Sequence, residues 1–136
     1  MAVLFSAIKI VDALPTPRHL PGSAGATAGA TIRGKQMADI TVAIIGAGIG
    51  GVYLAAELGV LGARLRLHDI DDSRLVELRN RGGIEVEGEN LGFAAIERAT
   101  PDLGAAVDHA DIIVIVTGGI FQASVARSLA PLLHDG

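Results

Sequence analysis

Three glycines and one aspartate carry the most specific chemical signal in this chain. Gly46, Gly48 and Gly51 stand in the spacing G-x-G-x-x-G, and Asp69 follows the last of them by 18 positions. In such a turn the first glycine permits the tight bend, the second lets backbone approach a pyrophosphate, and the third lets a helix pack closely on a sheet. Backbone N–H groups at the start of that helix face the phosphates, where the helix dipole favours negative charge. The pattern predicts a dinucleotide-binding turn.

The residues between these glycines are predicted to contact the same ligand through their backbone. They are Ala47, Ile49 and Gly50. The spacing alone is weak, since a glycine-rich turn without a ligand has the same letters. Three features support the stronger interpretation: an apolar run at 40–45, a helical pattern after the turn, and an acid at the expected distance.

Asp69 is predicted to select the dinucleotide. Its carboxylate would accept hydrogen bonds from the adenosine ribose hydroxyls and would repel a 2′-phosphate. Asp71 and Asp72 add charge of the same sign, and Arg74 is the cation close enough to compensate for it. We therefore expect NAD as the cofactor, with NADP less favoured, and we include Arg74 among the candidate binding residues.

The elements that must position these residues alternate along the chain. A nearly continuous apolar run such as 40–45 is typical of a parallel strand covered on both faces. Alternation of strands and helices predicts an α/β fold, a Rossmann-type doubly wound parallel sheet. We expect the sheet to be incomplete at its C-terminal end, because a further parallel strand would normally follow Gly136. The expected strands are 40–45, 64–68, 84–87, 93–97 and 111–116, and the expected helices are 49–61, 73–81, 100–107 and 121–133.

Composition excludes several classes of function. The 136 residues are half apolar and carry a net charge of −4, which argues against a nucleic-acid partner. The chain has no cysteine, so it has no disulfide and no thiolate nucleophile, and we predict no metal site. No apolar run is long enough to span a membrane, and no membrane partner is expected.

Residues 1–36 differ from the rest in composition. They hold three prolines and a stretch of small residues, with four basic residues against one acid. A secretory signal fits poorly because Lys9 and Asp12 interrupt the apolar region, and a transit peptide would have more Ser and Arg. We interpret 1–36 as a dispensable disordered extension, 37–136 as the dinucleotide-binding domain, and the protein as cytoplasmic.

The chain from residue 37 to residue 136 resembles the N-terminal NAD-binding domain of the octopine/nopaline (opine) dehydrogenase family. That family is related to glycerol-3-phosphate dehydrogenase, 6-phosphogluconate dehydrogenase and ketopantoate reductase. Many dehydrogenases share the glycine motif, whereas the sequence Arg-Gly-Gly-Ile-Glu-Val-Glu-Gly at 81–88 is more selective. The other matching stretches are 43–51, 68–75, 92–93, 99–103 and 110–116.

The resemblance implies a reaction in which an amino acid and a 2-oxo acid condense to an imine, which NAD(P)H reduces. It also implies that the loop Thr117-Gly118-Gly119 lies along the cofactor, although such enzymes often carry proline there. The resemblance implies that the catalytic His and its acidic partner belong to a C-terminal domain, which we expect this chain to lack. The catalytic residues are therefore unknown, and we expect substrates to act through that missing domain and this fragment alone to be inactive.

Other functions stay open. A short-chain dehydrogenase would need a Tyr-x-x-x-Lys pair, but the only tyrosine, Tyr53, falls in the first expected helix with no such lysine. A flavoprotein uses the same glycine spacing and is excluded less firmly. Two further alternatives are a stand-alone NAD(H)-binding or sensing module without catalysis and a nucleotide domain of the glycerol-3-phosphate dehydrogenase or ketopantoate reductase type.

Overall fold

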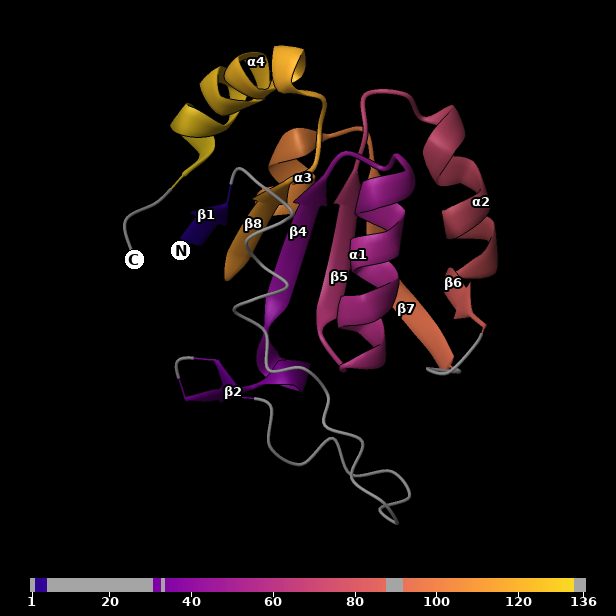
Figure 1. Cartoon of the computed structure of the whole chain (residues 1–136). Helices are drawn as coiled ribbons and strands as arrows, with labels where there is room; N and C mark the ends of the chain where they lie inside the picture. The colour runs from indigo at the N-terminus through magenta and orange to yellow at the C-terminus, as the bar shows by residue number, and fades with distance from the viewer. Residues whose placement is uncertain (1, 5–30, 33, 88–91, 134–136) are drawn as a thin grey trace.

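A mostly parallel six-stranded sheet runs through the computed structural model, which describes residues 2–4, 31–32, 34–87 and 92–133 (Figure 1). The strands lie side by side in the order β1-β8-β4-β5-β7-β6. β6 pairs antiparallel with β7, and the other pairings in this sheet are parallel. The strands are β1 (Ala2–Leu4), β4 (Thr41–Ile45), β5 (Arg64–His68), β6 (Gly83–Val86), β7 (Gly92–Thr100) and β8 (Ile112–Ile115).

The order of the strands creates a switch point beside β4. From β4 the chain moves outward to β5 and then β7, and it returns to place β8 on the opposite side of β4. In an open α/β sheet, ligands bind at the carboxyl ends of the strands where the order reverses in this way. The α/β, Rossmann-type prediction is confirmed, and the switch point lies between the ends of β4 and β8.

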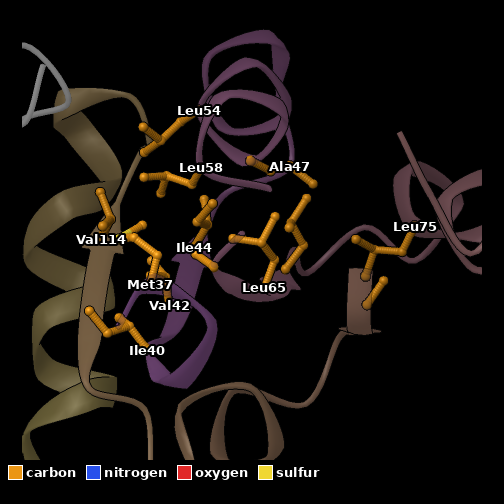
Figure 2. Packing of buried hydrophobic residues seen from close by; sticks show 14 residues of the cluster. Met37, Ile40, Val42, Ile44, Ala47, Leu54, Leu58, Leu65, Leu75 and Val114 are labelled. Atoms are coloured by element: carbon orange, nitrogen blue, oxygen red, sulfur yellow. The ribbon is translucent and has the colours of Figure 1, made fainter. Parts of the chain in front are cut away.

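Helices cover both faces of the sheet because the side chains of each strand alternate. Even-numbered residues of β4, such as Val42 and Ile44, pack beneath α1 (Ile49–Val60) and α2 (Ser73–Arg81). Figure 2 shows Leu54 and Leu58 of α1 lying over Ile44 and Val114. The odd-numbered residues Ala43 and Ile45 pack with α3 (Leu103–Val107) and α4 (Gly119–Leu129) on the other face. Each functional side chain at a strand end is therefore directed to one face by its position in the chain.

Local signals fix most helix ends. α2 spans the predicted residues 73–81 and stops at Gly82, which has φ +73°. α3 begins after Asp102, whose carboxylate accepts the Ala105 N–H at 3.1 Å. Pro101 precedes this cap, so the helix begins later than the expected start at residue 100. α4 begins at Gly119 and ends at Leu129, followed by the 3-10 turn η3 (Ala130–Leu132), so the helix is displaced from the expected 121–133.

The strands also differ in detail from their expected ranges. β7 runs from residue 92 to residue 100, longer than the expected 93–97, because its second half pairs with β5. Residues 88–91, between the strands expected at 84–87 and 93–97, lie outside the described residues, as does His134. No helix in the described part of the chain is long and apolar enough to cross a membrane.

Described parts of residues 1–36 take part in regular structure. β1 pairs in parallel with β8, and β2 (Thr31–Ile32) pairs with β3 (Lys35–Gln36). The Lys35 ammonium lies 2.7 Å from Asp111, which also accepts the Thr41 N–H at the start of β4. The edge of β8 and the Asp111 carboxylate just before it, both distant in sequence, provide these contacts. Residues 5–30 lie outside the description, and the boundary at 37 stays a prediction.

Candidate dinucleotide site

The turn between β4 and α1 requires glycine at two positions for steric reasons. Gly46 has φ +115°, and a Cβ there would overlap the Val116 carbonyl oxygen and lie 2.9 Å from its carbon. A Cβ at Gly51 would overlap the Gly46 carbonyl oxygen. The turn is therefore pressed against the end of β8 on one side and against its own helix on the other.

Gly48 has a different environment. A Cβ at this position would meet one atom within 4 Å, the Arg74 Nη1 at 3.6 Å. Gly48 is also the N-cap of α1, and the first helical bond runs from the Val52 N–H to the Gly48 oxygen at 3.0 Å. The N–H groups of Ile49 and Gly50 precede that bond and project from the helix end. The space beside Gly48 is thus open where an anion would meet these groups.

Asp69 holds the glycine turn against the end of β5. Its Oδ2 accepts the Ala47 N–H at 2.9 Å, and its Oδ1 accepts the Asp71 N–H at 2.9 Å. Each carboxylate oxygen can accept a second hydrogen bond, so capacity remains for two ligand hydroxyls. The sequence predicted a ligand contact for Asp69 but gave no sign that the same carboxylate shapes the turn.

The neighbouring acids are engaged with local partners. Asp71 accepts the N–H of Ser73 at 3.1 Å and its hydroxyl at 2.6 Å, and these bonds hold the pKa of Asp71 below its usual value. The hydrogen bond from Arg79 lowers the pKa of Asp72. Asp72 is the residue before α2, but its side chain makes no capping bond. Arg74 Nε lies 3.6 Å from Asp71, a loose pairing on an exposed surface.

A cleft of about 640 Å³ opens at the carboxyl ends of the strands, over the switch point. It is enclosed by the glycine turn, the end of β5, the loop after β8 and one side of α4. Six of the predicted binding residues line it: Gly46, Gly48, Asp69, Arg74, Thr117 and Gly118. Ala47 and Ile49 line an adjoining apolar hollow with Val52, Tyr53 and Ile84, and Gly48 and Arg74 border both spaces.

Three predicted residues line neither space. Gly51 is buried beneath the turn, where its role is the close approach of helix and strand. Gly50 and Gly119 are exposed near the starts of α1 and α4. The rim of the cleft carries exposed apolar side chains, with Ile70 at 85% and Phe121 at 54% of their full exposure. An apolar rim above a charged floor fits a ligand that has a flat base and a sugar-phosphate part.

His68 is a polar cleft residue that sequence reasoning missed. It is buried, with 6% exposure, and its Nε2 lies 3.1 Å from the Pro101 carbonyl oxygen. Its Nδ1 has no hydrogen-bond partner in the described part of the chain, and neither has the Thr117 hydroxyl. Burial lowers the pKa of His68, opposed by the bond to Pro101 and by the charge of Asp69. A single histidine before the strand-end acid gives no such signal in sequence.

The chain has a relative among known proteins. It is 40% identical over 97 residues to a protein named opine dehydrogenase from Arthrobacter sp. (strain 1C). The match covers 71% of this chain and 27% of the relative, so the chain spans about a quarter of that protein's length. No family model matches the chain.

Proposed function

We propose that this chain is the dinucleotide-binding part of an NAD-dependent oxidoreductase of the opine dehydrogenase type. The observation that carries the proposal is the glycine turn between β4 and α1, which is tied to Asp69 at the end of the neighbouring strand. The similarity to a protein named opine dehydrogenase supports the choice of family.

The residues present fit a dinucleotide. The pyrophosphate would lie beside Gly48, where the chain leaves space and the start of α1 offers N–H groups. The ribose hydroxyls would donate to the remaining acceptor sites of Asp69. A 2′-phosphate would stand close to Asp69 and Asp71, so the chain favours NAD, with Arg74 as the local counter-charge.

The whole enzyme would reduce an imine formed from an amino acid and a 2-oxo acid. When bound, the reduced cofactor supplies the hydride for that reduction. This chain's own part is to hold the cofactor across the carboxyl edge of the sheet and to exclude water from its adenosine half. We assign no acid or base for the proton transfer to the described residues, and we expect the chain alone to bind without turnover.

Titration with reduced cofactors tests the proposal directly. The fluorescence of NADH should change saturably when the whole chain is added, with weaker binding of NADPH, and the purified protein should show no flavin absorbance. Gly48→Val serves as the matched negative variant, because its side chain would occupy the pyrophosphate position while touching little of the protein. Absence of NADH binding by the folded wild-type chain would remove the proposed function. Flavin absorbance would favour the flavoprotein alternative.

A further inference from the structure

The protonation of His68 is fixed by its partner. A carbonyl oxygen can only accept, so the Nε2 that lies 3.1 Å from the Pro101 oxygen carries the proton and donates it. Burial lowers the pKa of the ring, which keeps it neutral near pH 7. In a neutral imidazole with a protonated Nε2, the Nδ1 atom is an acceptor. His68 therefore presents a lone pair at Nδ1.

That lone pair meets no hydrogen-bond donor among the described residues. Nδ1 exposes less than 1 Å² and has no hydrogen-bond partner there, in a side chain that helps to line the cleft. A buried acceptor without a partner destabilises the folded protein, because its hydrogen bonds to water are lost and not replaced. A ligand that brings a donor into the cleft would recover this free energy, provided that the atoms covering Nδ1 move aside.

The position of His68 indicates which half of a dinucleotide it would meet. Along β5, Leu65 and Leu67 face α1, so Asp69 lies on the α1 side, where it bonds the glycine turn. His68 faces the opposite side, toward Pro101 and the cleft beside α4. The two neighbouring residues thus address two different parts of a ligand that crosses the end of β5.

We propose that His68 recognises the adenine base of the dinucleotide through its 6-amino group, which would donate to Nδ1. The inference rests on the proposed function and extends it to the base. The adenosine half carries two kinds of donor, the ribose hydroxyls and the 6-amino group. Asp69 is placed for the hydroxyls on the α1 side, and His68 offers a neutral acceptor for the amino group on the other side.

Two substitutions separate the two nitrogens of this ring. His68→Gln can place an amide nitrogen near the position of Nε2, so it keeps a donor for Pro101 and removes the acceptor at Nδ1. His68→Asn can place a polar atom near Nδ1 and loses the bond to Pro101. The probe is the reduced hypoxanthine analogue of NADH, in which an oxo group replaces the 6-amino group and presents an acceptor to the acceptor Nδ1.

Both nucleotides are titrated by fluorescence against the wild-type chain and the two variants, with circular dichroism as the check on folding. We expect the wild type to bind NADH about five- to tenfold tighter than the analogue, the scale of one hydrogen bond. This preference should fall below about twofold in His68→Gln and persist in His68→Asn. In wild-type protein, the ¹⁵N resonance of Nδ1 should move on addition of NADH and less on addition of the analogue.

Each result decides the matter. Equal binding of the two nucleotides by wild-type protein overturns the assignment of His68, as does an unchanged preference in a folded His68→Gln variant. If neither variant folds, the ¹⁵N chemical shift of Nδ1 in wild-type protein tests the contact. An Nδ1 resonance that does not move on addition of NADH rejects it. A wild-type chain that binds neither nucleotide contradicts the proposed function itself, which is a distinguishable outcome.

Discussion

Two strand-to-helix turns flank the switch point, and both are rich in glycine for different reasons. In the turn from β4 to α1, a Cβ at Gly46 or Gly51 would overlap a backbone carbonyl oxygen. In the turn from β8 to α4, a Cβ at Gly118 would meet its nearest atom, on Phe121, at 3.7 Å, and one at Gly119 would meet nothing within 4 Å. Protein atoms close the first turn at Gly46 and Gly51 and leave space only beside Gly48, whereas both glycines of the second turn have open space beside them. We call them the closed turn and the open turn.

The difference teaches that glycine in the first turn is a requirement of the fold as well as of the ligand. The carbonyl that would block a side chain at Gly46 belongs to Val116, the residue directly after β8 and just before the second turn. The two turns therefore meet, and one forms part of the wall of the other. Substitution of glycines one at a time separates what the fold needs from what the ligand needs.

The largest effect is expected at Gly51. Gly51→Ala puts a methyl group onto the Gly46 carbonyl oxygen, so the first turn of α1 must move away from β4. Overpacking of this kind costs about 3 kcal/mol in the free energy of unfolding. Urea denaturation followed by circular dichroism measures it, with Gly119→Ala in the open turn as the matched control. Equal stability of the two variants would erase the contrast between the turns.

Gly48→Val should separate binding from folding within the closed turn. The added side chain meets Arg74, an exposed and movable group, so the midpoint of denaturation should change little. It would fill the space proposed for the pyrophosphate, and NADH affinity should fall by about a hundredfold or more, or roughly 3 kcal/mol. Titration and denaturation of the same sample measure both. A variant that binds NADH normally would place the ligand elsewhere.

The contrast between the turns also marks what sequence reasoning could predict. The glycine spacing, strand 64–68 and the helix 73–81 were predicted because their signals are local, such as Gly82 at a helix end. The hydrogen bond from Ala47 to Asp69 spans 22 residues, and the close contact between Gly46 and the Val116 carbonyl joins the ends of two strands. Neither leaves a local pattern, so the structural role of these residues appears only when the sheet is assembled.

The same limit applies to β1 and to His68. The pairing of residues 2–4 with β8 depends on an edge formed more than 100 residues later in the chain. The burial of His68 depends on the turn after β7, which supplies the Pro101 carbonyl. By contrast, the cofactor preference assigned to Asp69 follows from its hydrogen-bonding capacity and its charge, and it stays a prediction that substitution can test.

Asp69→Asn should weaken the closed turn and the binding of NADH together. An amide has one acceptor oxygen, so it cannot keep the bonds from both the Ala47 and the Asp71 N–H groups and also receive two hydroxyls. We expect NADH affinity to fall by about 1–3 kcal/mol and the preference for NADH over NADPH to narrow. Titrations with both cofactors measure this.

Asp72→Asn is the control for that substitution. It removes a nearby charge that is paired with Arg79 and makes no bond to the turn. If Asp72→Asn narrows the preference as much as Asp69→Asn does, general charge rather than Asp69 selects the cofactor.

His68, which lines the cleft, should make the free energy of unfolding depend on pH. The pKa of His68 is lowered from 6.5 in the folded protein, so the unfolded chain binds this proton more readily. Stability should therefore fall as pH drops through about 6.5, until the folded protein is protonated as well. Asp71, Asp72, Glu97 and Asp111 have lowered pKa values, so their contributions persist to more acidic pH. Denaturation experiments between pH 7.5 and about 5 should show the free energy of unfolding falling with pH, and the His68→Gln variant should lack this fall.

The smallest effect is expected at Gly119, where the open turn meets α4. Gly119 is the first residue of the helix and is exposed, and a methyl group there meets no atom within 4 Å. Alanine restricts the unfolded chain more than glycine and favours the helix, so Gly119→Ala should raise the free energy of unfolding by about 0.5 kcal/mol. NADH affinity should stay within about twofold of the wild type, because Gly119 lines neither the cleft nor the apolar hollow that adjoins it. A clear loss of affinity without loss of stability would mean that the cofactor reaches the start of α4, and that ligand rather than protein closes the second turn.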